Sequence, residues 1–154
     1  MFKLLLLFTS INLQTPEESL TNRLNEVVVT ATRAEQKVFD APASVDVINS
    51  KTLFKRAARS APEMLMTAPG VFLQKTNHGG GSPFVRGLTG NQTLLLVDGI
   101  RLNNSTFRYG PNQYFNTINP FSIDHIEVLR SGGSVQYGSD ALGGTIHVIT
   151  ANTV

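Results

Sequence analysis

The run His78 to Gly81 is a place in the chain where residue types and spacing could do chemistry. Consecutive glycine amides of this kind form an oxyanion hole in some esterases, where they stabilise developing negative charge. That reaction needs a serine nucleophile in a G-x-S-x-G turn. The sequence contains none, since the nearest segment, Gly132 to Gln136, lacks the closing glycine. A flexible glycine loop is therefore the favoured interpretation, with an esterase as a rival.

The same glycines do not form a phosphate-binding loop. Phe84 stands where the third glycine of a G-x-G-x-x-G pattern belongs, and no G-x-x-x-x-G-K-[ST] motif occurs. His78, His125 and His147 are far apart in the chain, with no acidic residues at ligand spacing. We therefore expect no catalytic residue, no metal site and no cofactor.

Arg86 and Arg130 each follow strand-like apolar residues, in "FVR" and "EVLR", and each precedes a small residue. This pattern places both guanidinium groups near the end of a strand. Two interpretations remain open for them. One is a solvated strand terminus, and the other is a bidentate pair with a carboxylate on a surrounding protein wall.

Length and composition limit the remaining functions. The chain has 154 residues, of which 41% are hydrophobic, enough for one domain with a modest core. Its 13 basic and 11 acidic residues are spread along the sequence, so there is no basic stripe for nucleic acid, and we expect no nucleic-acid partner. The absence of cysteine excludes disulfides and thiolate metal sites.

The N-terminus has the order of residues found in a secretory signal. Lys3 precedes the short apolar run 4–8, and Thr9 and Ser10 follow. We therefore predict a signal peptide at 1–10 and a flexible N-terminal segment over 11–40, which is polar and without hydrophobic period at its start. No later apolar run approaches the roughly 18 residues of a membrane-spanning helix.

The elements that must position these residues begin after Ala41. The alternation in 44–48 predicts a strand, and a short helix is expected from Lys51 to Arg59. Ser60 and Glu63 have the spacing of a capping box, which predicts a second helix that ends at Pro69-Gly70.

Strands and glycine turns dominate from Val71 onward. Asp98-Gly99 lies between two strand-like runs and predicts a hairpin with a type I′ turn, in which both residues have positive φ. The polar and aromatic stretch Asn104 to Pro120 is too long for an idle connector and predicts a functional loop. Further strands are expected at 126–130 and 145–150. The predicted fold is α+β, a small mixed β-sheet with two or three short helices and long loops.

The segment "EVVVTATR", residues 26–33, has strong strand preference but no obvious partner strand nearby. Three later segments follow it, "SAPEMLMTAPGVFLQ", "FVRGLTGNQTLLLVDGIRLNN" and "IDHIEVLRSGGSVQYGSDALGGTIHVIT". Together and in this order, the four segments resemble the plug domain of a TonB-dependent outer-membrane receptor. The resemblance covers roughly residues 26 to 151.

The resemblance implies that residues 26–33 are a TonB box, a strand presented to the periplasm. The periplasmic domain of TonB captures such a strand by β-strand addition, which would supply the missing partner. The alternative is an ordinary edge strand of the domain's own sheet. The residues implied to bind TonB are Glu26, Val27, Val28, Val29, Thr30, Ala31, Thr32 and Arg33.

The family fold implies a plug over residues 41–151 inside a barrel of about 22 strands, in the outer membrane of a Gram-negative bacterium. The N-terminus would face the periplasm. The chain is too short to contain the barrel, so we expect no β-barrel within it, and 152–154 would mark where the missing barrel region starts. In this reading Arg86 and Arg130 pair with glutamates of the barrel wall.

The implied function is energy-coupled import of a metal chelate such as a ferric siderophore or haem, by a chain that is a fragment or a truncated form of the receptor. The alternative is a stand-alone periplasmic module that engages TonB for binding or signalling. Substrate would contact the tips of apical loops through stacking and cation contacts. The residues implied at these tips are Asn77, His78, Asn91, Gln92, Phe107, Arg108, Tyr109 and Tyr114.

Overall fold

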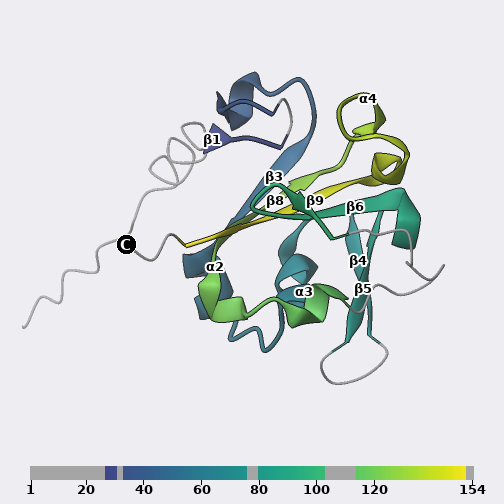
Figure 1. Cartoon of the computed structure of the whole chain (residues 1–154). Coiled ribbons are helices and arrows are strands. Elements are labelled where there is room, and N and C mark those ends of the chain that lie inside the picture. Colours follow the sequence, from purple (N-terminus) through teal and green to yellow (C-terminus); the bar gives the residue numbers. More distant parts are fainter. Residues whose placement is uncertain (1–26, 31–32, 76–79, 103–113, 152–154) are drawn as a thin grey trace, which may run out of the picture.

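The fold is centred on a mixed five-stranded sheet (Figure 1). The computed structural model describes residues 27–30, 33–75, 80–102 and 114–151. The strand order is β3-β8-β9-β6-β7, in which β6 and β9 run parallel and the other pairs antiparallel. The strands of this sheet are β3 (Val45–Asn49), β6 (Thr93–Val97), β7 (Ile100–Arg101), β8 (Ile123–Leu129) and β9 (Gly144–Thr150).

Two antiparallel pairs and several short helices flank this sheet. The pairs are β1 (Val27–Val28) with β2 (Gln36–Lys37), and β4 (Val71–Lys75) with β5 (Gly81–Val85). The α-helices are α2 (Ser50–Lys55), α3 (Ala61–Met64) and α4 (Ser134–Tyr137). The 3-10 helices are η1 (Val38–Asp40), η2 (Leu65–Thr67), η3 (Gly90–Gln92), η4 (Tyr114–Thr117), η5 (Pro120–Ser122) and η6 (Ser139–Ala141). The predicted α+β class is confirmed.

The alternation of side chains along β8 and β9 divides the sheet into two faces. Ile126, Val128, Ile146 and Val148 point to one face, where they join the largest apolar cluster with residues of α3, η2, β5 and η4. We call this the core face. Figure 1 shows α2, α3 and the β4–β5 pair on this side, and β1 and α4 on the other. The opposite face carries Glu127 of β8 and His147 of β9, and we call it the polar face.

The predicted hairpin is present between β6 and β7, with φ of 47° at Asp98 and 81° at Gly99. The Asp98 carboxylate also accepts hydrogen bonds from the amide and the hydroxyl of Thr150, at 2.8 and 2.7 Å. The turn therefore binds the end of β9 as well as joining two strands.

The two predicted helices are present but shorter than expected. α2 ends at Lys55, and Ala57 then adopts a φ of 49°, which a right-handed helix does not allow. At the start of α3 the Ser60 side chain makes no capping bond, and Glu63 accepts from the amide of Arg59 at 2.8 Å instead of from that of Ser60. None of the helices in the described part of the chain is long and apolar enough to cross a membrane.

Candidate functional site

The first half of the segment 26–33 has a partner strand within the chain. Val27 pairs with Lys37 and Val28 with Gln36, in a two-stranded sheet separate from the central one. The expectation that these two valines lack an internal partner is therefore wrong. Gln36 and Lys37 form only a two-residue strand of polar residues, which strand propensity does not reveal. Glu26, Ala31 and Thr32 lie outside the described residues.

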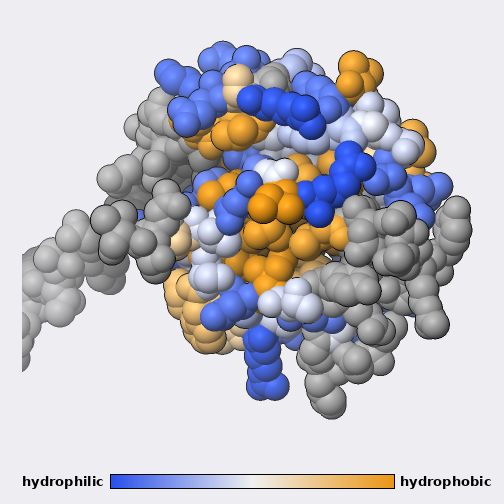
Figure 2. Space-filling view, in the orientation of Figure 1, coloured by the Kyte–Doolittle hydropathy of each residue, from blue (hydrophilic) through white to orange (hydrophobic). Residues whose placement is uncertain are grey.

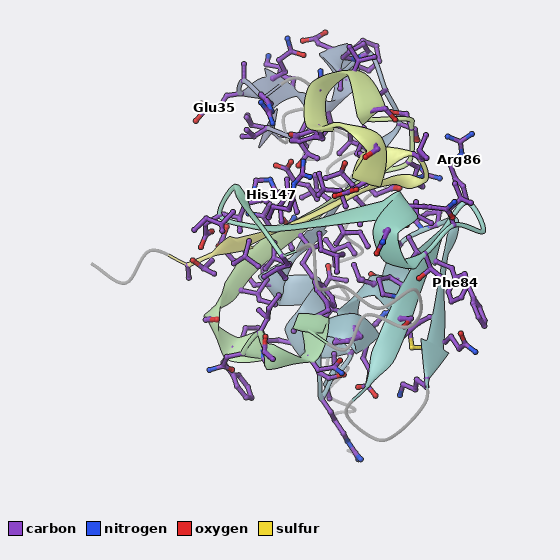
Figure 3. All side chains as sticks on the ribbon, turned by 45° about the vertical axis from the view of Figure 1, so that its right-hand side comes forward. Glu35, Phe84, Arg86 and His147 are labelled. Atoms are coloured by element: carbon purple, nitrogen blue, oxygen red, sulfur yellow. The ribbon has the colours of Figure 1, made fainter. Side chains whose placement is uncertain are left out.

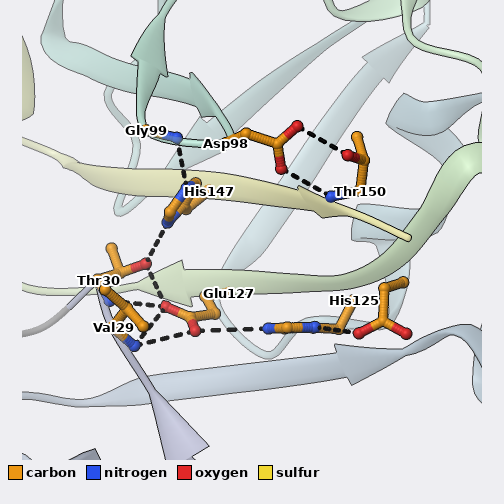
Figure 4. A network of polar contacts seen from close by, with 9 residues as sticks. Val29, Thr30, Asp98, Gly99, His125, Glu127, His147 and Thr150 are labelled. Carbon is orange, nitrogen blue, oxygen red and sulfur yellow. Dashed lines mark hydrogen bonds and ion pairs between the residues drawn. The ribbon is translucent and has the colours of Figure 1, made fainter. Parts of the chain in front are cut away.

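The described residues that follow, Val29, Thr30 and Arg33, are not part of a strand. The Arg33 amide donates to the Val29 carbonyl at 2.8 Å, and Arg33 has a φ of 58°. We call Val29, Thr30 and Arg33 the closed turn. The amides of Val29 and Thr30 point at the Glu127 carboxylate of β8, whose oxygens lie 3.0 and 3.1 Å from the Val29 nitrogen and 2.7 Å from that of Thr30 (Figure 4). The Thr30 hydroxyl donates to the same carboxylate.

A second row of polar contacts holds Thr30 from the other side. The Gly99 amide donates to His147 Nε2 at 2.9 Å, so this nitrogen is unprotonated. The Nδ1 of a neutral His147 then carries the proton, and it lies 3.1 Å from the Thr30 hydroxyl (Figure 4). The Tyr137 hydroxyl donates to the Thr30 carbonyl at 3.0 Å. Thr30 is thus bound through its amide, hydroxyl and carbonyl.

The charges at this site are matched to their surroundings. Burial acts to raise the pKa of Glu127, but the ion pair with His125 and the hydrogen bonds from Thr30 and the Val29 amide outweigh it and hold the pKa below its usual value. The carboxylate of Glu127 in turn raises the pKa of His125 against the effect of burial, and Asp124 adds to the rise. Burial lowers the pKa of His147, which keeps it neutral. Glu127 is therefore an ionised, fully buried acceptor.

Apolar contacts and one cation contact complete the attachment of the segment. Val28 is fully buried in a small cluster with Val45 and Leu129. The Arg33 guanidinium lies over the ring of Tyr137, 4.6 Å from its centroid. A half-open cavity of about 390 Å³ remains beside the closed turn. It is lined by Val29, Arg33, Leu96, Gly99, Arg101, Tyr137 and His147.

This arrangement is suited to binding a peptide segment. Among the described residues no group of three or more His, Asp or Glu side chains is placed to hold a metal ion. Every polar contact of Glu127 described above is a hydrogen bond or ion pair within the chain. The site therefore holds a peptide segment against a sheet.

The family model described as TonB-dependent Receptor Plug Domain matches residues 37–145. The chain belongs to this family of plug domains. Its relatives are outer-membrane TonB-dependent receptors of Gram-negative bacteria.

Three similar proteins illustrate the relationship. The vitamin B12 transporter BtuB of Vibrio vulnificus (strain CMCP6) is 36% identical over 149 residues, which are 96% of this chain and 24% of that protein. The iron-regulated outer membrane virulence protein of Vibrio cholerae is 40% identical over 131 residues, 80% of this chain and 20% of that protein. The crystal structure of the siderophore receptor PirA from Acinetobacter baumannii matches with a TM-score of 0.59 at 31% identity, over 71% of this chain and 17% of that one. The chain spans about a quarter or less of the length of these proteins, and none of the three is described as an enzyme.

The two predicted barrel-contacting arginines of the plug domain both lie next to Gly70. The Arg86 amide donates to the Gly70 carbonyl at 3.5 Å, and Arg130 Cδ lies 3.4 Å from where a Cβ on Gly70 would be. Arg86 is exposed, has a φ of 55°, and projects from the turn after β5 (Figure 3). The barrel contacts themselves stay a prediction.

Arg130 has polar partners within the plug domain that sequence reasoning missed. Its Nε lies 2.6 Å from Asp46 Oδ2, an ion-pair distance without the alignment of a hydrogen bond. Its Nη2 donates to the Ser44 hydroxyl at 2.8 Å. Asp46 comes from β3, which is far from Arg130 in sequence and adjacent to β8 in the sheet.

Few of the predicted substrate contacts of the plug domain fall within the described residues. Asn91 and Gln92 lie in η3 at the start of β6, where the Gln92 carbonyl accepts from Gly143 at 2.7 Å. Tyr114 is the first residue of η4. The remaining five, Asn77, His78, Phe107, Arg108 and Tyr109, lie outside the described residues.

The residue that sequence reasoning missed altogether is Glu127. Its signal was an acidic residue in β8 between two apolar residues, Ile126 and Val128. Alternation places Glu127 on the face opposite to those two residues. Only the structure shows that this second face is covered by the N-terminal segment of the plug domain.

Proposed function

We propose that this plug domain gates an outer-membrane receptor and that TonB captures residues 26–33 as an added strand. The observation that carries the proposal is the placement of Val27 and Val28. They form one strand of a two-stranded sheet that is separate from the central sheet, and Val27 is 46% exposed. Isolated two-stranded pairs are marginally stable, so an external strand can compete for the valine backbone.

The substrate class is a metal chelate, such as a ferric siderophore, haem or a cobalamin. The support is the family and the relatives named above, a vitamin B12 transporter and a siderophore receptor. In our proposal the substrate contacts are the predicted apical residues, of which Asn91, Gln92 and Tyr114 lie within the described part of the chain. The domain acts by binding and movement, without covalent chemistry.

The second partner is the barrel of the same receptor, in the outer membrane, with the N-terminus of the plug toward the periplasm. The proposed plug extends over 41–151, after an N-terminal segment that carries the box. Large apolar side chains on the surface support enclosure by a wall, and Figure 2 shows orange apolar residues among blue hydrophilic ones on one face. Phe121 and Phe72, for example, are 76% and 66% exposed. Arg86 and Arg130 are the residues that we propose for charged contacts with this wall.

The proposal is tested by binding of a purified TonB periplasmic domain to the 154-residue chain, measured by titration calorimetry. Val27→Pro removes a backbone N–H from the proposed added strand at an exposed position. It should weaken binding by about tenfold or more. Val28→Pro should do the same, although Val28 is buried and its packing also changes.

Lys37→Pro is the matched control for these variants. Lys37 pairs with Val27 but lies outside the box, and its φ of −68° and ψ of 142° already suit proline. Binding by Lys37→Pro should be at least as tight as that of the unmodified chain, because only the internal partner strand is weakened. Equal binding by Val27→Pro and the unmodified chain would contradict capture by strand addition.

A further inference from the structure

We propose that the buried carboxylate of Glu127 is an internal ligand that holds the TonB box closed, so that it competes with capture of the box by TonB. The proposal rests on the proposed function, because it names a residue that regulates that site. Neither the family match nor the relatives assign a role to Glu127.

The first argument is the conformation that Glu127 imposes. Successive N–H groups of an extended strand point to opposite sides, so they cannot bind one anion together. Here the amides of the consecutive residues Val29 and Thr30 both point at Glu127, at 3.0 and 2.7 Å. Such a concave pair of amides is an anion-binding arrangement of turns. The conformation that satisfies Glu127 is therefore incompatible with an added strand at these residues.

The second argument is that the closed turn occupies backbone groups which strand addition would use. The Val29 carbonyl accepts from Arg33, and the Thr30 carbonyl accepts from the Tyr137 hydroxyl. With both amides bound to Glu127, the described backbone at Val29 and Thr30 has its donors and acceptors engaged within the chain. TonB must replace these bonds before it can pair with this half of the box.

The third argument is burial. Glu127 and Thr30 are both fully buried, although each is polar. A buried carboxylate is costly unless hydrogen bonds compensate it, and the box supplies three donors, two amides and one hydroxyl. When the box leaves, the face of the sheet that it covers opens to water, which replaces those donors. The contact can therefore break without leaving a buried charge uncompensated.

The observed affinity of the chain for TonB is then the affinity of the open box multiplied by the fraction of chains whose box is open. Replacing Glu127 by glutamine should raise that fraction. The amide keeps the size of the side chain but replaces one accepting oxygen with an NH₂ donor, which opposes the Val29 and Thr30 amides. We expect Glu127→Gln to bind the TonB periplasmic domain about tenfold more tightly than the unmodified chain, since hydrogen bonds to charged groups are among the stronger ones.

The closed turn is tested first without TonB, by hydrogen exchange on the 154-residue chain. Glu127→Gln should speed exchange of the Val29 and Thr30 amides and leave the β8 and β9 amides protected, which also establishes that the variant folds. Thr30→Val removes the hydroxyl, which donates to Glu127 and accepts from His147 Nδ1, but keeps both amides, so it should give a smaller increase at the same amides. Unchanged exchange at Val29 and Thr30 in both variants would overturn the proposal.

Glu35→Gln is the matched control for both experiments. It makes the same chemical change close to the box, at an exposed side chain that points away from the domain (Figure 3). Its exchange and its affinity for the TonB domain should match those of the unmodified chain. Equal affinity of Glu127→Gln and Glu35→Gln would refute competition between Glu127 and TonB. If no chain binds TonB, the unmodified one included, the proposed function is contradicted. The hydrogen-exchange experiment would still show whether Glu127 holds the closed turn.

Discussion

The two faces of the five-stranded sheet use the same strands but hold their neighbours by different forces. The core face packs Ile126, Val128, Ile146 and Val148 against helices and the β4–β5 pair, within one large apolar cluster. On the polar face, Glu127 and His147 bind a short segment through hydrogen bonds, beside two small apolar clusters. Apolar packing on the core face is the sum of many small contacts, whereas the segment on the polar face is held by a few hydrogen bonds. The comparison indicates that the core face maintains the fold, and in our proposal the polar face holds a removable element.

The largest effect is expected on the core face. Ile146 of β9 is fully buried in the large cluster, so Ile146→Ala should lower the free energy of unfolding by about 2–5 kcal/mol. Urea denaturation monitored by circular dichroism measures this. Val135→Ala, at a fully exposed valine of α4, should change the stability by no more than about 0.5 kcal/mol. A loss at Ile146 no larger than at Val135 would remove the distinction between the faces.

A smaller and more local effect is expected at Val28. Val28→Ala should lower the free energy of unfolding by about 1.5 kcal/mol, because it removes the equivalent of two buried methylene groups from the small cluster around Val28. Since we propose that the segment detaches alone, faster amide exchange should be confined to β1, β2 and the closed turn. If β8 and β9 exchange faster to the same degree, the segment is an integral part of the core.

The smallest effect is the dependence of stability on pH, which has opposite signs for two histidines of the polar face. The raised pKa of His125, next to Glu127 and Asp124, means that the folded chain binds a proton more tightly than the unfolded chain. Its contribution is full below the unfolded pKa of about 6.5 and is lost as pH rises through the folded pKa. His125→Gln should therefore destabilise the chain more at about pH 5.5 than at about pH 8.

The lowered pKa of His147 has the reverse consequence. Burial keeps it neutral when folded, against the attraction of Glu127 and Asp98 and with the repulsion of His125. The unfolded chain gains a proton that the folded chain does not, so stability falls as pH drops below about 6.5. His147→Gln should remove part of this loss, and urea titrations across the pH range would measure it. Identical pH profiles for the unmodified chain and both variants would show that neither histidine is coupled to folding.

Local patterns allowed much of the fold to be predicted from the sequence. The Asp98-Gly99 turn, the strands at 126–130 and 145–150, and the α+β class follow from positive-φ preferences and alternation. The second helix was also predicted, although Glu63 binds the amide of Arg59 and not that of Ser60. These features depend on residues close to one another in the chain.

The candidate site was predicted only in part, because its contacts join distant segments. The sequence marks 26–33 as unusual, but Glu127 lies 97 residues beyond Thr30. Asp46 and Arg130 meet because β3 and β8 are neighbours in the sheet, which no local pattern reveals. Gln36 and Lys37 have low strand propensity. They pair with Val27 and Val28 only because the chain reverses direction between β1 and β2.

The most direct test of the central claim is hydrogen exchange of the 154-residue chain with and without a saturating TonB periplasmic domain. We predict that the β2 amides at Gln36 and Lys37 exchange faster when TonB is bound, because their partner strand has left, while β8 and β9 stay protected. The amides of Val27 and Val28 should become better protected as they join the added strand. Bound TonB that leaves β1 and β2 unchanged, and protects a surface on another part of the chain, would contradict the account.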